Sequence, residues 1–390
     1  MPFEKNIKLL RLISFFNDFT LYSALAIIYF SKVSGSYALG LSIFSFIMIS
    51  AAVFELPTGY FSDRYGRVKT LIFGSIAFLI GGIFYAIATN YWFLVIGAII
   101  QGLGRSCYSG NNDALLYDNL AQINKVENFA EENGKISSMS QLALAIAGVL
   151  GGIIAYFSLP LLMWLSTVSL FICVILSFYL IEVVDISPIN QNIFIHIKQA
   201  LKNFISNFKL RQISLTNIIS FGFGEAAWEF ESVFISSLWP VWAIGISKVL
   251  SHIGATFSFH FSGRIIKKFT AIKIIIFDNF ISKIVNLIAL FTANIFSPIL
   301  MSSTSLLYGV NETASKNLLQ NEFSDQQRAT MGSLNSLFGS ILFAIFAVIL
   351  GLLADKFGPR NALFIKEIIA FLVFIPLYRF KKAISKNDNK

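Results

Sequence analysis

The sequence predicts an all-α membrane protein with twelve spanning helices, and two observations lead to this prediction: the composition and the spacing of apolar runs. Of 390 residues, 56% are hydrophobic and only 13% are charged, and the mean hydropathy is +0.71. A soluble protein is usually about one quarter charged. A water-soluble fold of this length could not hide so much apolar surface, so the expected solvent is lipid.

Apolar runs long enough to cross a bilayer follow one another along the whole chain, since a spanning helix needs about 20 apolar residues. Twelve runs have this length, at residues 7–31, 36–61, 70–90, 91–116, 136–157, 160–182, 213–236, 243–263, 271–292, 295–319, 329–353 and 361–380. The eighth is the weakest, because Lys248, His252 and His260 dilute it. The first is interrupted by Asn17 and Asp18 and has no small-residue cleavage site, so it is interpreted as a membrane helix and not as a signal peptide.

One long polar interruption, at 183–212, divides these runs six and six. We therefore expect an N-terminal six-helix bundle over 1–182, a cytoplasmic linker over 183–212 and a C-terminal six-helix bundle over 213–390. Apolar residues of the linker at 193, 197, 201, 204, 205 and 208 would share one face of a helix. This pattern fits an amphipathic helix on the inner membrane surface, and it fits a plain tether between the two halves equally well.

The basic residues indicate the orientation, because cytoplasmic loops are enriched in Lys and Arg. With the N-terminus inside, most basic residues fall on the inner side, in the loops at 64–69, 125–135, 198–211 and 264–268 and in the C-terminal tail. The outer side receives Lys32, Lys356 and Arg360, with Lys248 and Lys366 as further candidates. We expect both termini to be cytoplasmic. The net charge of +9 does not indicate nucleic-acid binding, because the basic residues form no block interleaved with polar residues.

A charged turn separates the second and third runs, with the sequence Gly59-Tyr-Phe-Ser-Asp-Arg-Tyr-Gly-Arg-Val-Lys69. Its glycines permit a tight turn and close helix approach. It resembles the signature loop of the major facilitator superfamily, whose pattern is Gly-x-x-x-Asp-Arg/Lys-x-Gly-Arg-Arg/Lys. The matching residues are Gly59, Asp63, Arg64, Gly66 and Arg67, whereas Val68 departs from the pattern.

This resemblance implies two pseudo-symmetric six-helix bundles around a central cavity that opens alternately to either side of the membrane. In that family the loop acts as a conformational latch between the halves, and the resemblance carries this role to Asp63, Arg64 and Arg67. The simpler alternative is that the basic residues of the loop only mark the cytoplasmic side.

Two further segments resemble the twelve-helix drug:proton antiporters of the superfamily only in part. Gln101-Gly-Leu-Gly104 matches a motif of proton-coupled members, but Ala98 stands where the motif has Arg. Arg105 could replace that Arg in a charge relay, or it could pair with Asp63. Ala147-Gly-Val-Leu-Gly-Gly152 resembles an antiporter signature in which Gly148 replaces Pro. Small residues for close helix packing are the favoured interpretation of this segment.

Acidic residues inside apolar runs are the candidates for a proton or substrate site, because a buried charge in a membrane usually faces a partner or a cavity. In the first run these are Asp18 and its neighbour Asn17, although a plain polar contact between helices is also open. In the seventh run, Glu225 and Glu229 share one helix face near Trp228. Helices 1 and 7 both line the cavity in the superfamily, so a carboxylate from each is expected there.

The remaining charges within runs are assigned less specific roles. Glu312 is a cavity candidate, and Glu55 has either a relay or a structural role. Asp278 and Lys283 are five residues apart, which does not favour an intrahelical pair, and one of them is expected to snorkel from a helix end. The histidines lack metal-ligand spacing, and Cys107 and Cys173 lie in apolar runs, so we expect no metal site, no cofactor and no disulfide framework.

The sequence therefore predicts a secondary transporter and not an enzyme, since no nucleotide-binding or nucleophile motif is placed to work. We expect proton-coupled export of drug-like or amphiphilic compounds across a bacterial inner membrane by a monomer. The main alternative is a proton symporter that imports a nutrient, siderophore or metabolite. A remote alternative is a membrane sensor that transports nothing.

Overall fold

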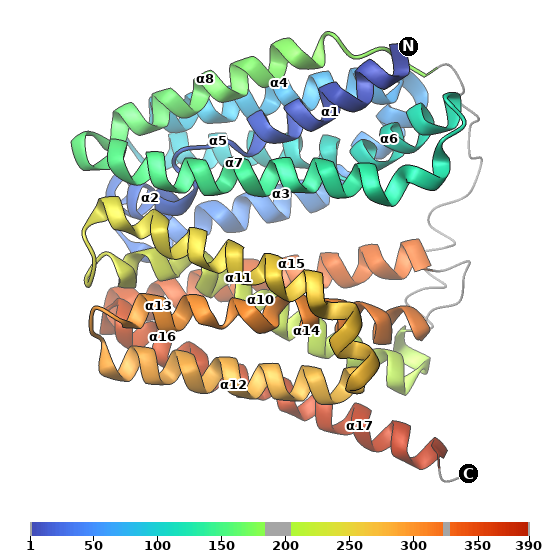
Figure 1. The fold of residues 1–390 in the computed structure, drawn as a ribbon. Helices are drawn as coiled ribbons and strands as arrows, with labels where there is room; N and C mark the ends of the chain where they lie inside the picture. The colour runs from blue at the N-terminus through green and yellow to red at the C-terminus, as the bar shows by residue number, and fades with distance from the viewer. Residues whose placement is uncertain (1, 184–203, 323–327, 389–390) are drawn as a thin grey trace. The chain divides into compact units, whose positions relative to one another are not determined.

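The computed structural model describes residues 2–183, 204–322 and 328–388, and its regular structure over these ranges is helical. The chain divides into two compact units (Figure 1). One comprises Met1–Ile189 with Pro240–Val249, and the other comprises Asn190–Trp239 with Leu250–Lys390. Each unit is described by itself below.

The first unit is a helical bundle in which α5 packs against both α3 and α4, α4 packs against α8, and α1 packs against α7. Its elements are α1 (Pro2–Asp18), η1 (Ser23–Leu25), α2 (Ala26–Ser34), α3 (Tyr37–Tyr65), α4 (Arg67–Ala86), α5 (Tyr91–Tyr108), α6 (Asn111–Gln122), η2 (Val126–Asn128), α7 (Phe129–Phe157) and α8 (Leu159–Ser177).

In the second unit α10 packs against α15, α12 packs against α14 and α16, and α17 returns against α10. Its elements are α10 (Phe208–Ile235), α11 (Val241–Lys268), whose first turns belong to the first unit, α12 (Ala271–Thr292), α13 (Ser297–Ser303), α14 (Ser305–Asn321), α15 (Arg328–Phe357), α16 (Pro359–Ala370), η4 (Phe371–Val373) and α17 (Phe374–Asp388).

The predicted all-α fold is confirmed, because every predicted run coincides with one helix or with two or three consecutive helical segments. Eight helical segments of the described chain are long and apolar enough to cross a membrane. The helices α10 and α11 fall below that limit because polar and ionisable side chains interrupt their apolar stretches. Most of the linker, including residues 193–203 of the proposed amphipathic helix, lies outside the described residues.

Four predicted spans are broken where the sequence suggested continuous helices. The first is split at 19–22, between α1 and η1, and the fourth is split at Ser109 and Gly110, where Gly110 has a φ of +69° that an α-helix cannot contain. The tenth is divided into α13 and α14, and the twelfth contains the η4 turn. Apolar length alone does not detect such breaks, because the flanking apolar residues keep each run long enough to span, even where polar residues such as Ser109 and Asn111 mark the break.

Glycines of α7 explain how the broken first span is packed. A Cβ atom at Gly151 would lie 1.9 Å from the carbonyl oxygen of Leu21, which is in the break. In the same unit, a Cβ at Gly152 would lie 2.5 Å from the carbonyl oxygen of Trp242, and a Cβ at Gly245 would lie 1.8 Å from that of Gly148. These approaches support the packing interpretation of the 147–152 segment, because only glycine leaves the space.

We expect Gly151→Ala to destabilise the protein by about 1–3 kcal/mol, because the added methyl group would displace the backbone at Leu21. Gly134→Ala is the matched control in the same helix. A Cβ at Gly134 meets nothing within 4 Å, so this change should be neutral or should stabilise by up to about 1 kcal/mol. Thermal unfolding of the full chain in detergent measures both. Equal midpoints for the two variants would show that the break does not depend on this contact.

Candidate functional site

Asp18 is the last residue of α1, so its carboxylate lies at the break in the first span. The Ser140 hydroxyl of α7 donates a hydrogen bond to Asp18 Oδ2, and Asn17 Nδ2 donates one to Asp18 Oδ1 at 3.3 Å. Arg105 on α5 is close enough for its positive charge to attract the same carboxylate. Three predicted site residues of the first unit are therefore brought together, and Ser140 is an additional partner.

The helix end gives this site a preference for positive charge. Carbonyl groups at the C-terminus of a helix carry a partial negative charge, which disfavours a carboxylate there unless a cation or a proton is also bound. The amide oxygen Asn17 Oδ1 is buried and has no hydrogen-bond donor in the described part of the chain. The broken end of α1 thus offers a carboxylate, an amide oxygen and backbone carbonyls to a proton or a cationic group.

A buried polar network lies near Asp18 in the first unit. The Tyr108 hydroxyl is 2.6 Å from Ser75 Oγ and 3.6 Å from the sulfur of Cys173, and the charge of Asp18 acts on both Tyr108 and Cys173. Cys107 and Cys173 are free thiols. This network joins α4, α5 and α8.

In the second unit, α10 and α14 bring acidic side chains around one tyrosine. Glu225 and Glu312 are both close enough for their negative charges to interact electrostatically with the hydroxyl of Tyr308. Glu312 is also 2.9 Å from Lys316 in an ion pair one turn along α14. Trp228 packs edge to face on His252 with a ring separation of 5.7 Å, and Glu229 is half-buried one residue further along α10.

The signature turn is built on a capped helix start. Gly66 has a φ of +109°, in the left-handed region that favours glycine, and a Cβ there would lie 2.4 Å from Glu182 Oε2. The Glu182 carboxylate accepts hydrogen bonds from the backbone N–H groups of Arg67, at 2.9 Å, and Val68, at 3.0 Å. A carboxylate at the N-terminus of α4 pairs free N–H donors and complements the helix dipole.

Asn6 holds Glu182 in place, because it fixes the backbone one residue earlier. The fully buried Asn6 donates to the carbonyl of Ile181 at 2.7 Å and accepts from its N–H at 3.0 Å. It also donates to Asn119 on α6 at 2.8 Å. The segment after α8 is thereby tied to α1, to α6 and to the start of α4.

The other residues of the turn have separate partners. Arg67 forms an ion pair with Asp118 at 2.9 Å, and Arg64 donates to the Tyr60 hydroxyl at 2.9 Å. Asn111 at the start of α6 donates to the carbonyl of Arg67 at 2.9 Å. Burial raises the pKa of the Asp118 carboxyl above its ordinary value, and the charge of Arg67 acts in the opposite direction.

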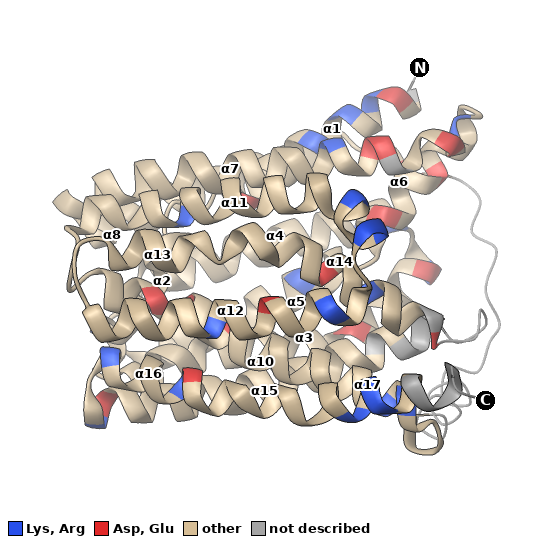
Figure 2. Cartoon of the chain, turned by 60° about the horizontal axis from the view of Figure 1, so that its bottom comes forward, with Lys and Arg blue, Asp and Glu red and all other residues tan. Residues whose placement is uncertain are grey.

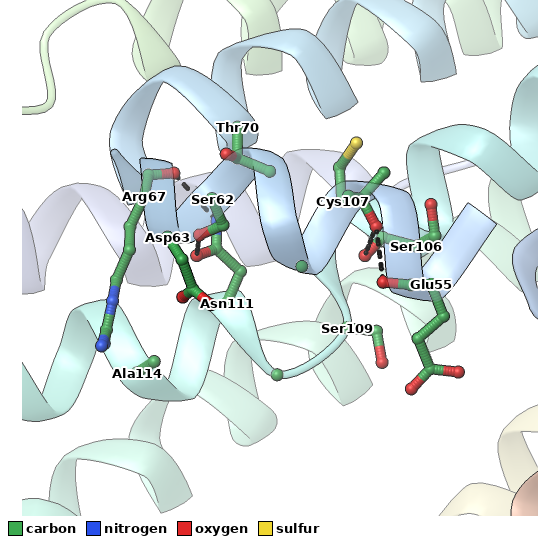
Figure 3. Close-up of a pocket in the computed structure, with 13 residues that line it drawn as sticks. Glu55, Ser62, Asp63, Arg67, Thr70, Ser106, Cys107, Ser109, Asn111 and Ala114 are labelled. Atoms are coloured by element: carbon green, nitrogen blue, oxygen red, sulfur yellow. Dashed lines mark hydrogen bonds between the residues drawn. The ribbon is translucent and has the colours of Figure 1, made fainter. Parts of the chain in front are cut away.

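A polar cavity of about 150 Å³ opens beside this turn (Figure 3). Its walls include the predicted Glu55, Gly59, Asp63 and Arg67 together with Asn111. Asp63 is exposed, and it has no hydrogen-bond or ion-pair partner within the described part of the chain. Over the same residues, Arg105 forms no hydrogen bond or ion pair with Asp63.

One placement made from the sequence is wrong. Asp278 does not snorkel from a helix end, since it lies within α12 and is only 8% exposed, and Lys283 lies farther inside the same helix. Lys248 and Lys366, the further candidates for the outer side, are buried by helix packing.

Several residues of the site were not identified from the sequence. Glu182 and Asn111 carried a weak signal, because one is the acidic residue that ends the sixth run and the other follows Gly110, which precedes α6. Ser140, Asp118 and Tyr108 carried none, since their roles come from packing between helices. Over the described residues, no group of three or more His, Cys, Asp or Glu side chains could hold a metal ion.

The helical bundles, apolar spans and enclosed polar residues define a multi-span membrane transporter, and comparison with known proteins gives its family. The family model of the Major Facilitator Superfamily matches residues 9–341. This chain belongs to the Major Facilitator Superfamily, as the signature turn indicated.

Similar proteins agree with this assignment. An MFS-type transporter of Bacillus subtilis, YxaM, is 24% identical over 364 residues, which cover 88% of this chain and 87% of YxaM. An uncharacterized transporter of Buchnera aphidicola from Acyrthosiphon pisum is 31% identical over 160 residues, covering 41% of this chain. That match spans only 40% of the Buchnera protein, and the match to the Escherichia coli transport protein YajR spans 25% of YajR.

Solved structures share the fold at low sequence identity. The nucleoside transporter NupG superposes with a TM-score of 0.79 at 15% identity, over 96% of this chain and 99% of NupG. A bacterial homologue of the human lysosomal transporter Spinster superposes with a TM-score of 0.77 at 13% identity, over 97% of this chain and 98% of that one. Such similarity shows the twelve-helix fold and does not identify the substrate.

We expect Glu182→Ala to lower the unfolding free energy by about 1–2 kcal/mol, because it leaves the N-terminus of α4 without its carboxylate. Glu182→Gln keeps an acceptor oxygen and loses only the charge, so its effect should be smaller. Glu127→Gln, at an exposed position in η2, serves as the control for loss of a negative charge. Thermal unfolding in detergent ranks the three variants, and a Glu182→Ala midpoint equal to that of the control would contradict the cap.

Proposed function

We propose that this protein is a secondary active transporter that exports drug-like or amphiphilic compounds in exchange for protons by alternating access. One observation carries this proposal: Asp18 stands at the broken end of a membrane helix, beside an amide oxygen that has no donor in the described residues. A carboxylate in that position is a site for a proton or a cationic group, because the helix dipole there disfavours the uncompensated negative charge.

The residues around Asp18 support proton exchange there. Ser140 and Asn17 donate hydrogen bonds to the ionised form, and Arg105 supplies a positive charge that stabilises it after a proton leaves. A proton and a cationic substrate would then compete for the same carboxylate, which couples the movement of one to the other. In this proposal Arg105 serves as the charge relay in place of the Arg of the motif, whose position Ala98 occupies in this chain.

The acidic residues of the second unit are the proposed second wall of the cavity. The negative charges of Glu225 and Glu312 both interact with the Tyr308 hydroxyl. Glu229 and Trp228 continue along α10 and would contribute a further carboxylate and an aromatic face to an amphiphilic substrate. Glu55 lines the cavity beside the signature turn, where we assign it to the relay.

Import by proton symport is the second candidate. The Escherichia coli galactose-proton symporter is 34% identical over 109 residues, covering 27% of this chain and 21% of the symporter. Ala98 and Gly148 depart from the export motifs, which also favours import. Substrate accumulation in cells with and without the gene separates the directions, since an exporter lowers accumulation and an importer raises it. A membrane sensor without transport is the remote third candidate, and uptake into proteoliposomes would exclude it.

We expect Asp18→Asn to reduce proton-driven transport in proteoliposomes at least about tenfold, because the amide cannot exchange a proton. Asp113→Asn is the control, since Asp113 is exposed on α6. A thermal unfolding midpoint close to that of the unmodified protein would show that the fold of Asp18→Asn is intact. Unchanged coupling in that variant would remove Asp18 from the mechanism.

The proposed role of Asp63, Arg64 and Arg67, with Gly59 and Gly66, is a conformational latch between the two halves. Asp63 and Cys107 line the same cavity, so the native thiol reports on opening there. In a Cys173→Ala background, we expect Asp63→Asn to increase the maleimide labelling rate of Cys107 several-fold. Lys69→Gln, which changes an exposed charge in the same turn, should leave the rate unchanged. Equal rates in Asp63→Asn and the control would contradict the latch.

The proposal also places both termini in the cytoplasm of a bacterial cell, with 1–182 and 213–390 as the two halves of a monomer joined by 183–212. Lys267 and Lys268 at the end of α11 and the basic residues of α17, blue in Figure 2, support this orientation, because cytoplasmic segments are enriched in Lys and Arg. Labelling of introduced cysteines from either side of the membrane and the mass of the detergent-solubilised protein test these assignments.

A further inference from the structure

A second set of ionisable residues lies within the second unit, on α12 and α16, whose ribbons carry both acidic and basic positions (Figure 2). Asp278, Lys366 and Glu367 are 8%, 6% and 3% exposed, and Lys283 is half-buried one turn beyond Asp278. Two carboxyl groups and two amines are therefore enclosed in apolar helices. Buried charges of this kind are costly unless each one is paired or neutralised.

One half of this cluster is locked in its charged form. Glu367 Oε1 is 2.9 Å from the Lys366 ammonium in an ion pair, and it accepts a second hydrogen bond from Asn286 Nδ2 at 2.9 Å. A carboxylate that accepts from both an ammonium and an amide is stabilised as the anion, because each donor favours negative charge. We therefore treat Glu367 and Lys366 as a fixed pair.

The other half is bonded to neutral groups that accept either protonation state. Ser282 Oγ donates to Asp278 Oδ1 at 2.8 Å, and this hydroxyl can turn to accept from a protonated carboxyl instead. Lys283 Nζ donates to Asn279 Oδ1 at 2.9 Å and lies 5.9 Å from the centre of the Phe374 ring. Within the described residues, neither Asp278 nor Lys283 has an oppositely charged atom within ion-pair distance.

The charged groups around this pair come from a few elements. The charges of Asp278 and Lys283 attract each other. Lys283 is also repelled by Lys366 and attracted by Glu367. The helix α13 has no ionisable residue, and Glu312 and Lys316 of α14 pair with each other. The other basic residues of α16 and α17 are directed elsewhere: Arg360 donates to the carbonyls of Leu290 and Phe291, and Arg379, Lys381 and Lys382 are exposed.

We propose that Asp278, with Lys283 as its counter-charge, is a second proton-binding site of this transporter, located in a different unit from Asp18. The juxtaposition that carries this inference is a Lys366–Glu367 ion pair beside a buried carboxyl, Asp278, whose hydrogen bond to Ser282 suits both of its protonation states. The inference deepens the proton coupling proposed above, since it adds a titrating group to the second half of the molecule.

The proton balance of the site is simple. Asp278 as carboxylate with Lys283 as ammonium is neutral overall. Uptake of one proton forms an O–H bond on Asp278 and leaves a single positive charge on Lys283, which lies by the Phe374 ring, is repelled by Lys366 and is attracted by Glu367. Release of the same proton restores the neutral pair. Lys283 keeps its proton throughout, so it is a positioning residue.

Infrared difference spectroscopy tests this site directly, because the carbonyl stretch of a protonated carboxyl appears and disappears as pH changes. The sample is the full chain in lipid bilayers without substrate, and the probe is the proton itself. We expect Asp278→Asn to remove one titrating carboxyl band that remains in Asp18→Asn. Lys283→Met should keep the band and move its transition toward higher pH by about 1–3 units, because the counter-charge is gone.

Glu322→Gln, on a half-buried acid at the end of α14, is the matched control and should leave this band in place. An Asp278→Asn spectrum identical to that of the unchanged protein would overturn the proposal, as would an unmoved transition in Lys283→Met. If Asp278→Asn fails to fold, Lys283→Met alone decides the question. The infrared measurement does not depend on transport, so its result can be interpreted even if the proposed export is disproved.

Discussion

The bilayer offers no water to hydrogen-bond a polar group, and this constraint shapes both halves of the structure. A helix that stops inside the membrane exposes carbonyl groups that need partners, and α1 stops at Asp18. The break is tolerated because Gly151 lets the backbone at Leu21 approach α7 and because Ser140 and Asn17 bond the carboxylate. The interruption that would destabilise a membrane helix thus becomes the place where charge can be held.

At the helix ends of the first bundle, polar groups are instead paired with one another by hydrogen bonds. Glu182 completes the start of α4, and Asn6 fixes the segment that carries Glu182. The signature turn is therefore held from inside its own unit, and Asp63 remains exposed at its edge. A turn with rigid support and one exposed acid suits a latch that must engage and release. The fixed pair of Lys366 and Glu367 gives the second unit a comparable rigid support within its helices.

The sequence was sufficient to predict the twelve-helix fold and its family, because apolar length and one ten-residue motif depend on local residues. It could not predict the break at 19–22, since only Asn17 and Asp18 marked this position and the close approach of Leu21 to Gly151 comes from packing between helices far apart in the sequence. For the same reason the partners of Asp18 and Gly66 were missed. Asp278 was misplaced because a single sequence shows that a run contains a charge but not which helix encloses it.

The most direct test of the account is transport by the unmodified protein in proteoliposomes with an imposed pH gradient, using a panel of amphiphilic cations as candidate cargo. The account predicts that at least one compound accumulates against its own gradient, that protons move in the opposite direction, and that an uncoupler abolishes both. Cargo movement that equilibrates without any dependence on the proton gradient would contradict it.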